Sequence, residues 1–157
     1  MQLLILLSSL LAALTVASPI RERAGGPEAV PIPANCTILN TLPHSTCGNG
    51  TVNGYMPATN FTSAHLLYQS YFAGFLTISE QWQQCSQQCY GYGTKGSCKS
   101  VLLSYNTPVP AGWLGTPGGD LVTGCIMFNA YITPNDFVAA PSGQYVNETA
   151  GSIYCPP

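Results

Sequence analysis

The chain has 157 residues, enough for one domain of ordinary size, and only 6% of them are charged, against about a quarter in an average soluble domain. Four Lys or Arg face six Asp or Glu without forming a basic stripe, so nothing supplies the counter-charge that nucleic-acid phosphates require, and no nucleic-acid partner is expected. Solubility must come from neutral polar residues or from attached sugar.

Residues 1–18 are typical of a secretory signal peptide. The run from Leu3 to Ala17 is apolar but too short to cross a hydrocarbon layer of about 30 Å comfortably, and small residues precede its end. Residues 19–34, PIRERAGGPEAVPIPA, are rich in Pro, Gly and charge, a composition that predicts a disordered lead or propeptide. We expect a domain over residues 35–157 and no membrane span after signal cleavage.

The first half of this domain is expected to contain loops, one strand and one helix. Gly, Pro, Asn and Thr are dense from Cys36 to about residue 60, which predicts loops and short strands, and residues 65–72 read as a strand. Thr77 and Glu80 form a capping box at the start of a helix. Gly91 and Gly93 follow as residues that can end it.

The predicted helix has an apolar stripe and a polar, uncharged face. The stripe consists of residues at steps of four, three and four: Ile78, Trp82, Cys85 and Cys89. The polar face consists of Gln81, Gln83, Gln84, Ser86, Gln87 and Gln88. The pattern predicts that the two cysteines point into the domain.

The second half reads as two strands and a tail. Residues 99–105 and 121–130 are the strands, and Cys125 lies in the second. The loop between them, residues 106–119, is rich in Pro and Gly. The tail mixes turns with short apolar pieces and ends near Cys155.

Three roles are open to the seven cysteines: zinc binding, redox catalysis and disulfide bonding. Structural zinc needs four ligands, but the Cys85-x3-Cys89 pair has no second close pair, and His44 and His65 are isolated. Redox sites favour C-x-x-C at a helix N-terminus, where the thiol pKa is lowered. Cys85 and Cys89 instead have C-x3-C spacing and lie in the middle and later part of the predicted helix. A disulfide framework is therefore predicted, with a connectivity that the spacing leaves open, and neither metal nor cofactor is expected.

Both the cysteines and the sequons indicate a secreted, extracellular or cell-wall glycoprotein. All the cysteines follow the signal segment, and disulfides persist outside the cell. The N-x-[ST] sequons predict sugar on exposed loops at Asn35, Asn49, Asn60 and Asn147.

The spacing of these motifs resembles a known family. The run Leu42-Pro43-His44-Ser45-Thr46-Cys47-Gly48, the helical cysteine pair, Cys98, the segment Gly124-Cys125-Ile126-Met127-Phe128 and Cys155 make residues 36–155 similar to the PAN/Apple fold, in particular to small secreted cysteine-rich proteins of filamentous fungi. The resemblance implies an α+β domain in which a single helix packs on a curled antiparallel β-sheet. The long loop between Cys98 and Cys125 departs from the family pattern.

The resemblance also implies a disulfide pattern. Carried over to this chain, the bonds are Cys85–Cys125, Cys89–Cys98 and Cys47–Cys155. Cys36 is then unpaired, or it replaces Cys47 as the partner of Cys155. An unpaired Cys36 would permit a disulfide-linked dimer.

No catalytic residue is predicted. Glu80 is accounted for by the helix cap, and Asp120 and Asp136 lie in turn sequences. Ser104 and His65 could be imagined as nucleophile and base, but Ser104 is not in a G-x-S-x-G elbow. A small hydrolase based on Asp120 and Asp136 is the least favoured function.

The aromatic residues give the remaining functional signal. Tyr90 and Tyr92 bracket the helix end and Trp113 lies in the long loop, so these three are candidates for binding, against the alternative that they cap a small core. The resemblance implies adhesion or recognition. We expect a secreted, non-catalytic binding module for carbohydrate or protein, with a structural or effector-like cell-wall protein as the alternative.

Overall fold

The structure is a computed structural model that describes residues 27–43, 54–72 and 74–156. The predicted signal peptide, residues 19–26 of the predicted lead, Cys47 and Asn49 lie outside these residues. Within them the chain forms an α+β domain with two α-helices, two antiparallel sheets and three disulfides.

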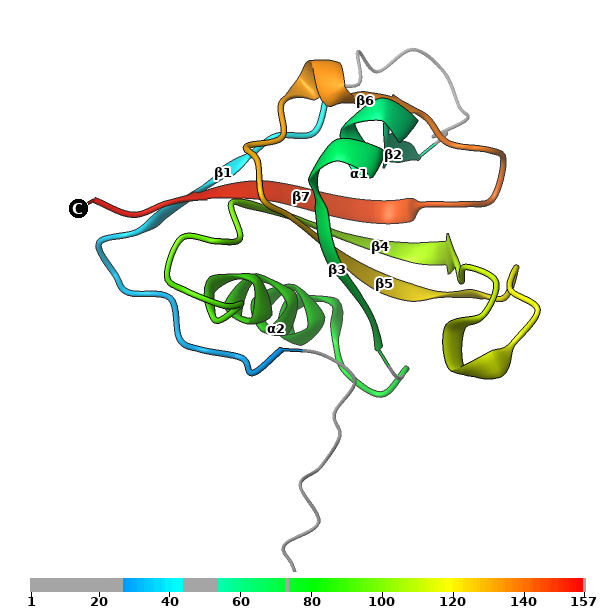
Figure 1. Ribbon diagram of the computed structural model, residues 1–157, viewed down its shortest axis with the longest axis horizontal. Helices are drawn as coiled ribbons and strands as arrows, with labels where there is room; N and C mark the ends of the chain where they lie inside the picture. The colour runs from blue at the N-terminus through cyan, green and yellow to red at the C-terminus, as the bar shows by residue number, and fades with distance from the viewer. Residues whose placement is uncertain (1–26, 44–53, 73, 157) are drawn as a thin grey trace, which may run out of the picture.

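A five-stranded sheet in the order β1-β7-β4-β5-β3 forms the centre of the fold (Figure 1). Its strands are β1 (Thr37–Asn40), β3 (Leu66–Phe72), β4 (Ser100–Pro108), β5 (Leu121–Phe128) and β7 (Val146–Tyr154). The strands predicted at 65–72, 99–105 and 121–130 correspond to β3, β4 and β5. β7 lies in the tail, where the sequence indicated only turns and short apolar pieces.

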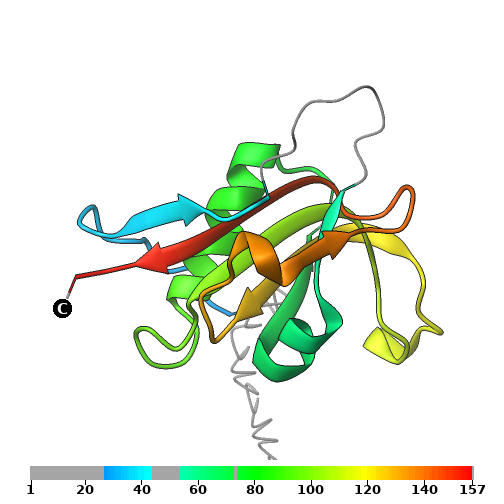
Figure 2. The same ribbon diagram turned by 90° about the horizontal axis from the view of Figure 1, so that it is seen from above.

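Both faces of this sheet are covered. Helix α2 (Ile78–Tyr90) packs on one face, and helix α1 (Thr59–His65) lies on the other with the two-stranded sheet of β2 (Tyr55–Pro57) and β6 (Phe137–Ala139), as Figures 1 and 2 show. Successive strand residues point to opposite faces. In β4, Val101 and Leu103 therefore join the core beneath α2, and Leu102 joins the core on the α1 side.

The expectation of a single helix was wrong, because α1 forms in a segment with weak helix propensity. Its N-cap, Ala58, makes no side-chain capping bond. Phe61 anchors the helix, because its ring is buried and forms a T-shaped pair with the ring of Phe128 at a centroid distance of 5.3 Å. Tertiary packing thus overrides local preference.

Helix α2 begins as predicted, with a reciprocal capping box between Thr77 and Glu80, but its buried face is rotated from the expected one. Ile78 is 55% exposed, whereas Gln81 and Gln88 are almost fully buried. Gln81 Oε1 accepts a hydrogen bond from the Tyr105 hydroxyl, and Gln88 Oε1 accepts one from Ser70 Oγ at 3.1 Å. The two amide oxygens can be buried because hydroxyl groups in the sheet donate hydrogen bonds to them.

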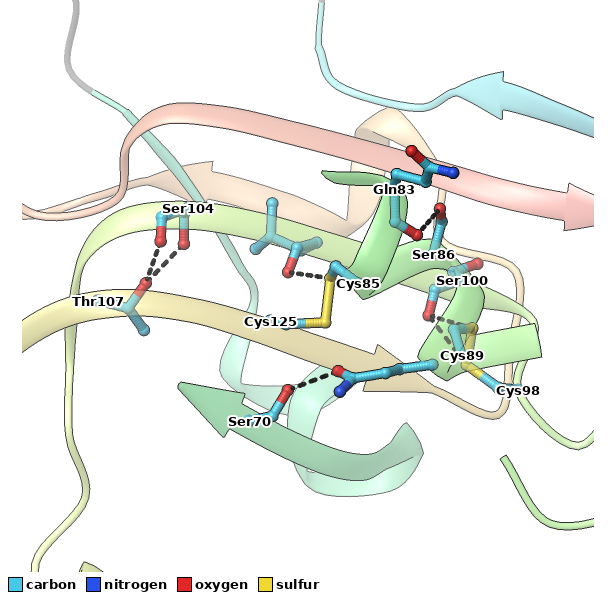
Figure 3. Close-up of a disulfide and its surroundings, with 12 residues drawn as sticks. Ser70, Gln83, Cys85, Ser86, Cys89, Cys98, Ser100, Ser104, Thr107 and Cys125 are labelled. Atoms are coloured by element: carbon cyan, nitrogen blue, oxygen red, sulfur yellow. Dashed lines mark hydrogen bonds between the residues drawn. A yellow bond between two sulfur atoms is a disulfide. The ribbon is translucent and has the colours of Figure 1, made fainter. Parts of the chain in front are cut away.

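Two disulfides fasten α2 to its surroundings. Cys85 is bonded to Cys125 in β5, and Cys89 to Cys98 just before β4, as the resemblance implied. Figure 3 shows Cys85 bonded to Cys125 of the sheet and, near the other end of the helix, Cys89 with Cys98. All four cysteines are buried.

The third bond is not Cys47–Cys155 but the alternative pairing, in which Cys36 replaces Cys47. Cys155 is bonded to Cys36, with their Cα atoms 4.2 Å apart. The register of β1 on β7 places Thr37 opposite Tyr154, so residue 36 falls opposite residue 155. A dimer linked through Cys36 is likewise contradicted, because its sulfur is used within the chain.

The domain also begins earlier than predicted. Within the predicted lead, residues 27–34 run along α2, where Val30 N donates to Gln87 O at 3.1 Å and Ile32 packs against the core. Gly91 permits this contact, because a Cβ there would lie 2.5 Å from Glu28 O. Its φ of −81° is an ordinary one, so this glycine is needed for close approach, not for a left-handed helix end.

Candidate functional site

A cleft of about 290 Å³ lies between the turn that follows α2 and the C-terminal end of β7. Tyr90 and Tyr131 are its aromatic lining residues, and Lys95 and Lys99 are its charged ones. The rest of the lining is mostly apolar and comes from Gly96, Cys98, Ile153, Cys155 and Pro156. An aromatic and apolar hollow with a few polar groups is the usual form of a small-molecule binding site.

The turn that carries Lys95 is braced from within. The Thr94 and Ser97 hydroxyls are 2.8 Å apart, and Ser97 N donates to Thr94 O at 2.9 Å. Gly93 and Gly96 have φ values of 62° and 84°, which side chains rarely tolerate. The Cys89–Cys98 bond closes this turn, so Lys95 lies on a short, covalently bounded loop.

Lys99 is fixed from two sides. Its backbone N–H donates to Phe128 O and its carbonyl accepts from Ile153 N, both at 2.8 Å. Its ammonium lies 5.0 Å from the centroid of the Tyr131 ring, a cation–π distance. Tyr131 in turn stacks on Tyr154, with centroids 4.4 Å apart and planes 9° apart. A ring stacked at that distance occupies one face of Tyr131, so the ammonium must lie over the other.

Buried hydroxyl groups anchor the segment that carries Tyr131. Ser100 Oγ and Ser152 Oγ are 2.8 Å apart in adjacent strands, and both are fully buried. Ile132 N donates to Ser100 Oγ at 2.9 Å, and Ile132 O accepts from Ser152 Oγ at 3.3 Å. The residue after Tyr131 is therefore tied to β4 and β7 through its backbone.

The structure does not bring the three predicted binding residues together. Tyr90 lines the cleft, but Tyr92 packs against the core, with its ring centroid 6.0 Å from that of Tyr68. Trp113 begins the 3-10 helix η1 (Trp113–Gly115) and forms a T-shaped pair with Tyr71, with ring centroids 4.7 Å apart. Figure 1 shows η1 and the C-terminal end of α2 at opposite ends of the sheet. The tyrosines at 131 and 154 and both lysines were missed, although two lysines four residues apart beside Cys98 were a usable signal.

Burial has an electrostatic effect at the Trp113 end. Desolvation, with a smaller contribution from Tyr145, raises the pKa of Tyr71 to about 12. Burial also raises the pKa of Tyr145. The hydroxyl groups of Tyr71 and Tyr145 therefore keep their protons near neutral pH.

Three of the residues considered for catalysis, Asp136, His65 and Ser104, have side-chain hydrogen-bond partners. Asp136 ends the 3-10 helix η2 (Pro134–Asp136), and its carboxylate accepts from Thr133 N at 2.8 Å and from Thr133 Oγ1 at 2.6 Å. His65 Nδ1 lies 2.9 Å from Asn129 Oδ1. Ser104 is fully buried, with its hydroxyl 2.6 Å from that of Thr107. Asp120 is exposed beside Gly118 and Gly119, which both have positive φ.

Three of the predicted glycosylation sites lie in the described residues, and all are exposed. Asn35 precedes β1, Asn60 lies in the first turn of α1 instead of in a loop, and Asn147 lies in β7 with a φ of 49°.

Neither a metal site nor a membrane-spanning helix is found in the part of the chain that the structure describes. No three metal-ligating side chains are grouped there, and none of its helices is both long and apolar enough to cross a bilayer. Comparisons of the chain with protein-family models, with curated proteins and with solved structures found no match.

Proposed function

We propose that this chain is a secreted, non-catalytic binding module that recognises carbohydrate through the cleft between the α2–β4 turn and β7. The observation that carries the proposal is the composition of this cleft. Two tyrosines and two lysines line a hollow whose remaining walls are mostly apolar. This site replaces the predicted combination of Tyr90, Tyr92 and Trp113.

A saccharide matches the cleft in size and in chemistry. About 290 Å³ is at the lower end of the range for ligand sites, roughly 300–1,000 Å³, so the cleft would hold a short part of a glycan. Sugars present hydroxyl groups around an apolar ring face. Tyrosine hydroxyls and ammonium groups donate to such hydroxyls, and Tyr90 and Ile153 offer apolar surface to the ring.

Secretion and kinship with PAN/Apple modules belong to the same proposal. Three disulfides favour an oxidising compartment. The two bonds that hold α2 support the kinship, as does the antiparallel sheet on which the helix packs.

The test is binding of the secreted protein to a panel of immobilised neutral and acidic polysaccharides. We expect at least one to be retained, and Tyr131→Ala to weaken its retention because the Lys99 ammonium loses its support. Tyr131→Phe, which keeps the ring, serves as the conservative variant. Trp113→Ala, at the other end of the sheet, serves as the control and should bind like the wild type. The proposal fails if no polysaccharide is retained, or if only Trp113→Ala loses binding.

A further inference from the structure

The positive charge of the domain is confined to the cleft. From residue 24 onward the sequence contains two lysines, no arginine and five acidic residues. Both lysines, Lys95 and Lys99, line the cleft, and none of the acidic residues does. A cleft with two cations in a domain of net negative charge has a local potential that favours an anion.

The two lysines line the same cleft, and no acidic residue lines it with them. Lys99 is positioned by its backbone bonds and by the Tyr131 ring, and Lys95 by the disulfide-closed turn. The ring attracts the Lys99 ammonium through its quadrupole and leaves the N–H donors available. Neither ammonium makes an ion pair or hydrogen bond with any residue in the described ranges. Like charges in one cleft repel each other, and a bound anion removes that cost.

We infer that the cleft binds an acidic saccharide, with the carboxylate or sulfate group of the sugar between the ammonium groups of Lys95 and Lys99. The inference rests on the proposed function and adds the charge of the ligand to it. Lysine is a compact point charge without the planar fork of arginine, so it accepts either oxyanion. The hydroxyl groups and ring of the same sugar then face Tyr90, Tyr131 and Ile153.

The experiment compares ligands that differ only in charge. A short oligogalacturonate is titrated against its methyl ester, which has the same sugar backbone without the carboxylates, and dextran sulfate is compared with dextran. The first pair reports on a carboxylate and the second on a sulfate ester. Polyglutamate is added as a carboxylate polymer that is not a saccharide.

Four variants locate the charge effect. An exposed charge pair contributes roughly 0.2–1 kcal/mol, so Lys95→Gln and Lys99→Gln should each weaken oligogalacturonate binding by up to about fivefold. Lys99→Arg keeps the charge and should retain most of the affinity. Asp120→Asn makes the net charge one unit more positive at a remote turn and should leave the affinity unchanged. Added salt should weaken binding of the charged ligands only.

The outcomes separate this inference from the proposed function. Tight binding of one charged saccharide, weak binding of its neutral partner and losses in both lysine variants would support the inference. Equal binding of charged and neutral partners would overturn it and leave the proposed function intact. Preference for polyglutamate over every acidic saccharide would overturn it in favour of an acidic peptide. Failure of every glycan to bind would refute the proposed function itself.

Discussion

Removing the Cys36–Cys155 bond should cost more stability than removing Cys89–Cys98. In the chain-entropy description, a disulfide stabilises mainly by restricting the unfolded chain, and the effect grows with the logarithm of the loop it closes. The Cys36–Cys155 bond spans 119 residues, which corresponds to about 4.9 kcal/mol at 25 °C. The Cys89–Cys98 bond spans only 9 residues, which corresponds to about 2.6 kcal/mol.

The loss of side-chain packing makes the expected difference in stability between the two variants smaller but does not reverse its sign. Cys89 and Cys98 are 0% and 5% exposed, so truncating both to Ala also loses roughly 1 kcal/mol of burial. Cys36 and Cys155 are only half-buried and lose less. The double variant Cys36→Ala/Cys155→Ala should therefore be less stable than Cys89→Ala/Cys98→Ala by about 1 kcal/mol.

The assay is guanidinium unfolding followed by tryptophan fluorescence. Every protein, including the reference, carries Cys47→Ser, so that the seventh cysteine of the sequence takes no part in disulfide exchange during the measurement. A loss of about 4.9 kcal/mol approaches the whole free energy of unfolding of many domains, so the guanidinium titrations are repeated in a stabilising osmolyte. The reasoning is refuted if the short-loop variant proves the less stable of the two.

Three further predictions concern packing, hydrogen bonding and ionisation. Gly91→Ala should lower the free energy of unfolding by about 1–3 kcal/mol and expose residues 27–34 to limited proteolysis. Gly74→Ala is the control and should leave the melting temperature nearly unchanged, because a Cβ there meets nothing within 4 Å. Equal melting temperatures of the two variants would contradict the packing of residues 27–34 on α2. Tyr105→Phe leaves the buried Gln81 amide oxygen without its hydrogen-bond donor. The free energy of unfolding, measured with a denaturant, should fall by about 1–3 kcal/mol. No change would show that water takes the place of the hydroxyl group. Because burial raises the pKa of Tyr71 to about 12, this hydroxyl loses its proton at lower pH in the unfolded chain than in the folded one. The free energy of unfolding should therefore fall as pH rises from about 10 toward 12, and it should fall less in Tyr71→Phe. An equal fall in both proteins would show that Tyr71 is not responsible.

The sequence predicted the elements that depend on neighbouring residues. The Thr77 and Glu80 pair marks the start of α2 because both capping bonds lie within four residues. Residues 65–72, 99–105 and 121–130 were strands for a similar reason, since their β-forming residues are contiguous. The helix α1 was missed because what holds it is the contact of Phe61 with Phe128, a residue in another element.

Features that depend on the register of distant strands were not predictable in the same way. The choice of Cys36 over Cys47 follows from the alignment of β1 with β7 across more than a hundred residues. The cleft has the same origin, because β7, the turn after α2 and the segment around Tyr131 meet only once the sheet has formed. Of the aromatic residues predicted to bind, only Tyr90 lines this cleft.

The hydrogen-bonded layer between α2 and the sheet affects how the stability of this domain responds to low pH. Every polar side chain buried in the described part of the chain is a hydroxyl or a primary amide, with Gln81, Gln88 and Ser100 among them. Acid unfolds proteins mainly where carboxylates that are paired or hydrogen-bonded in the folded state, or histidines that are buried in their neutral form, must take up protons. The buried groups beneath α2 have no proton to take up, so acidification should act instead on the exposed start of the helix, where hydrogen bonds from Thr77 lower the pKa of the Glu80 carboxylate and protonation removes their stabilising effect.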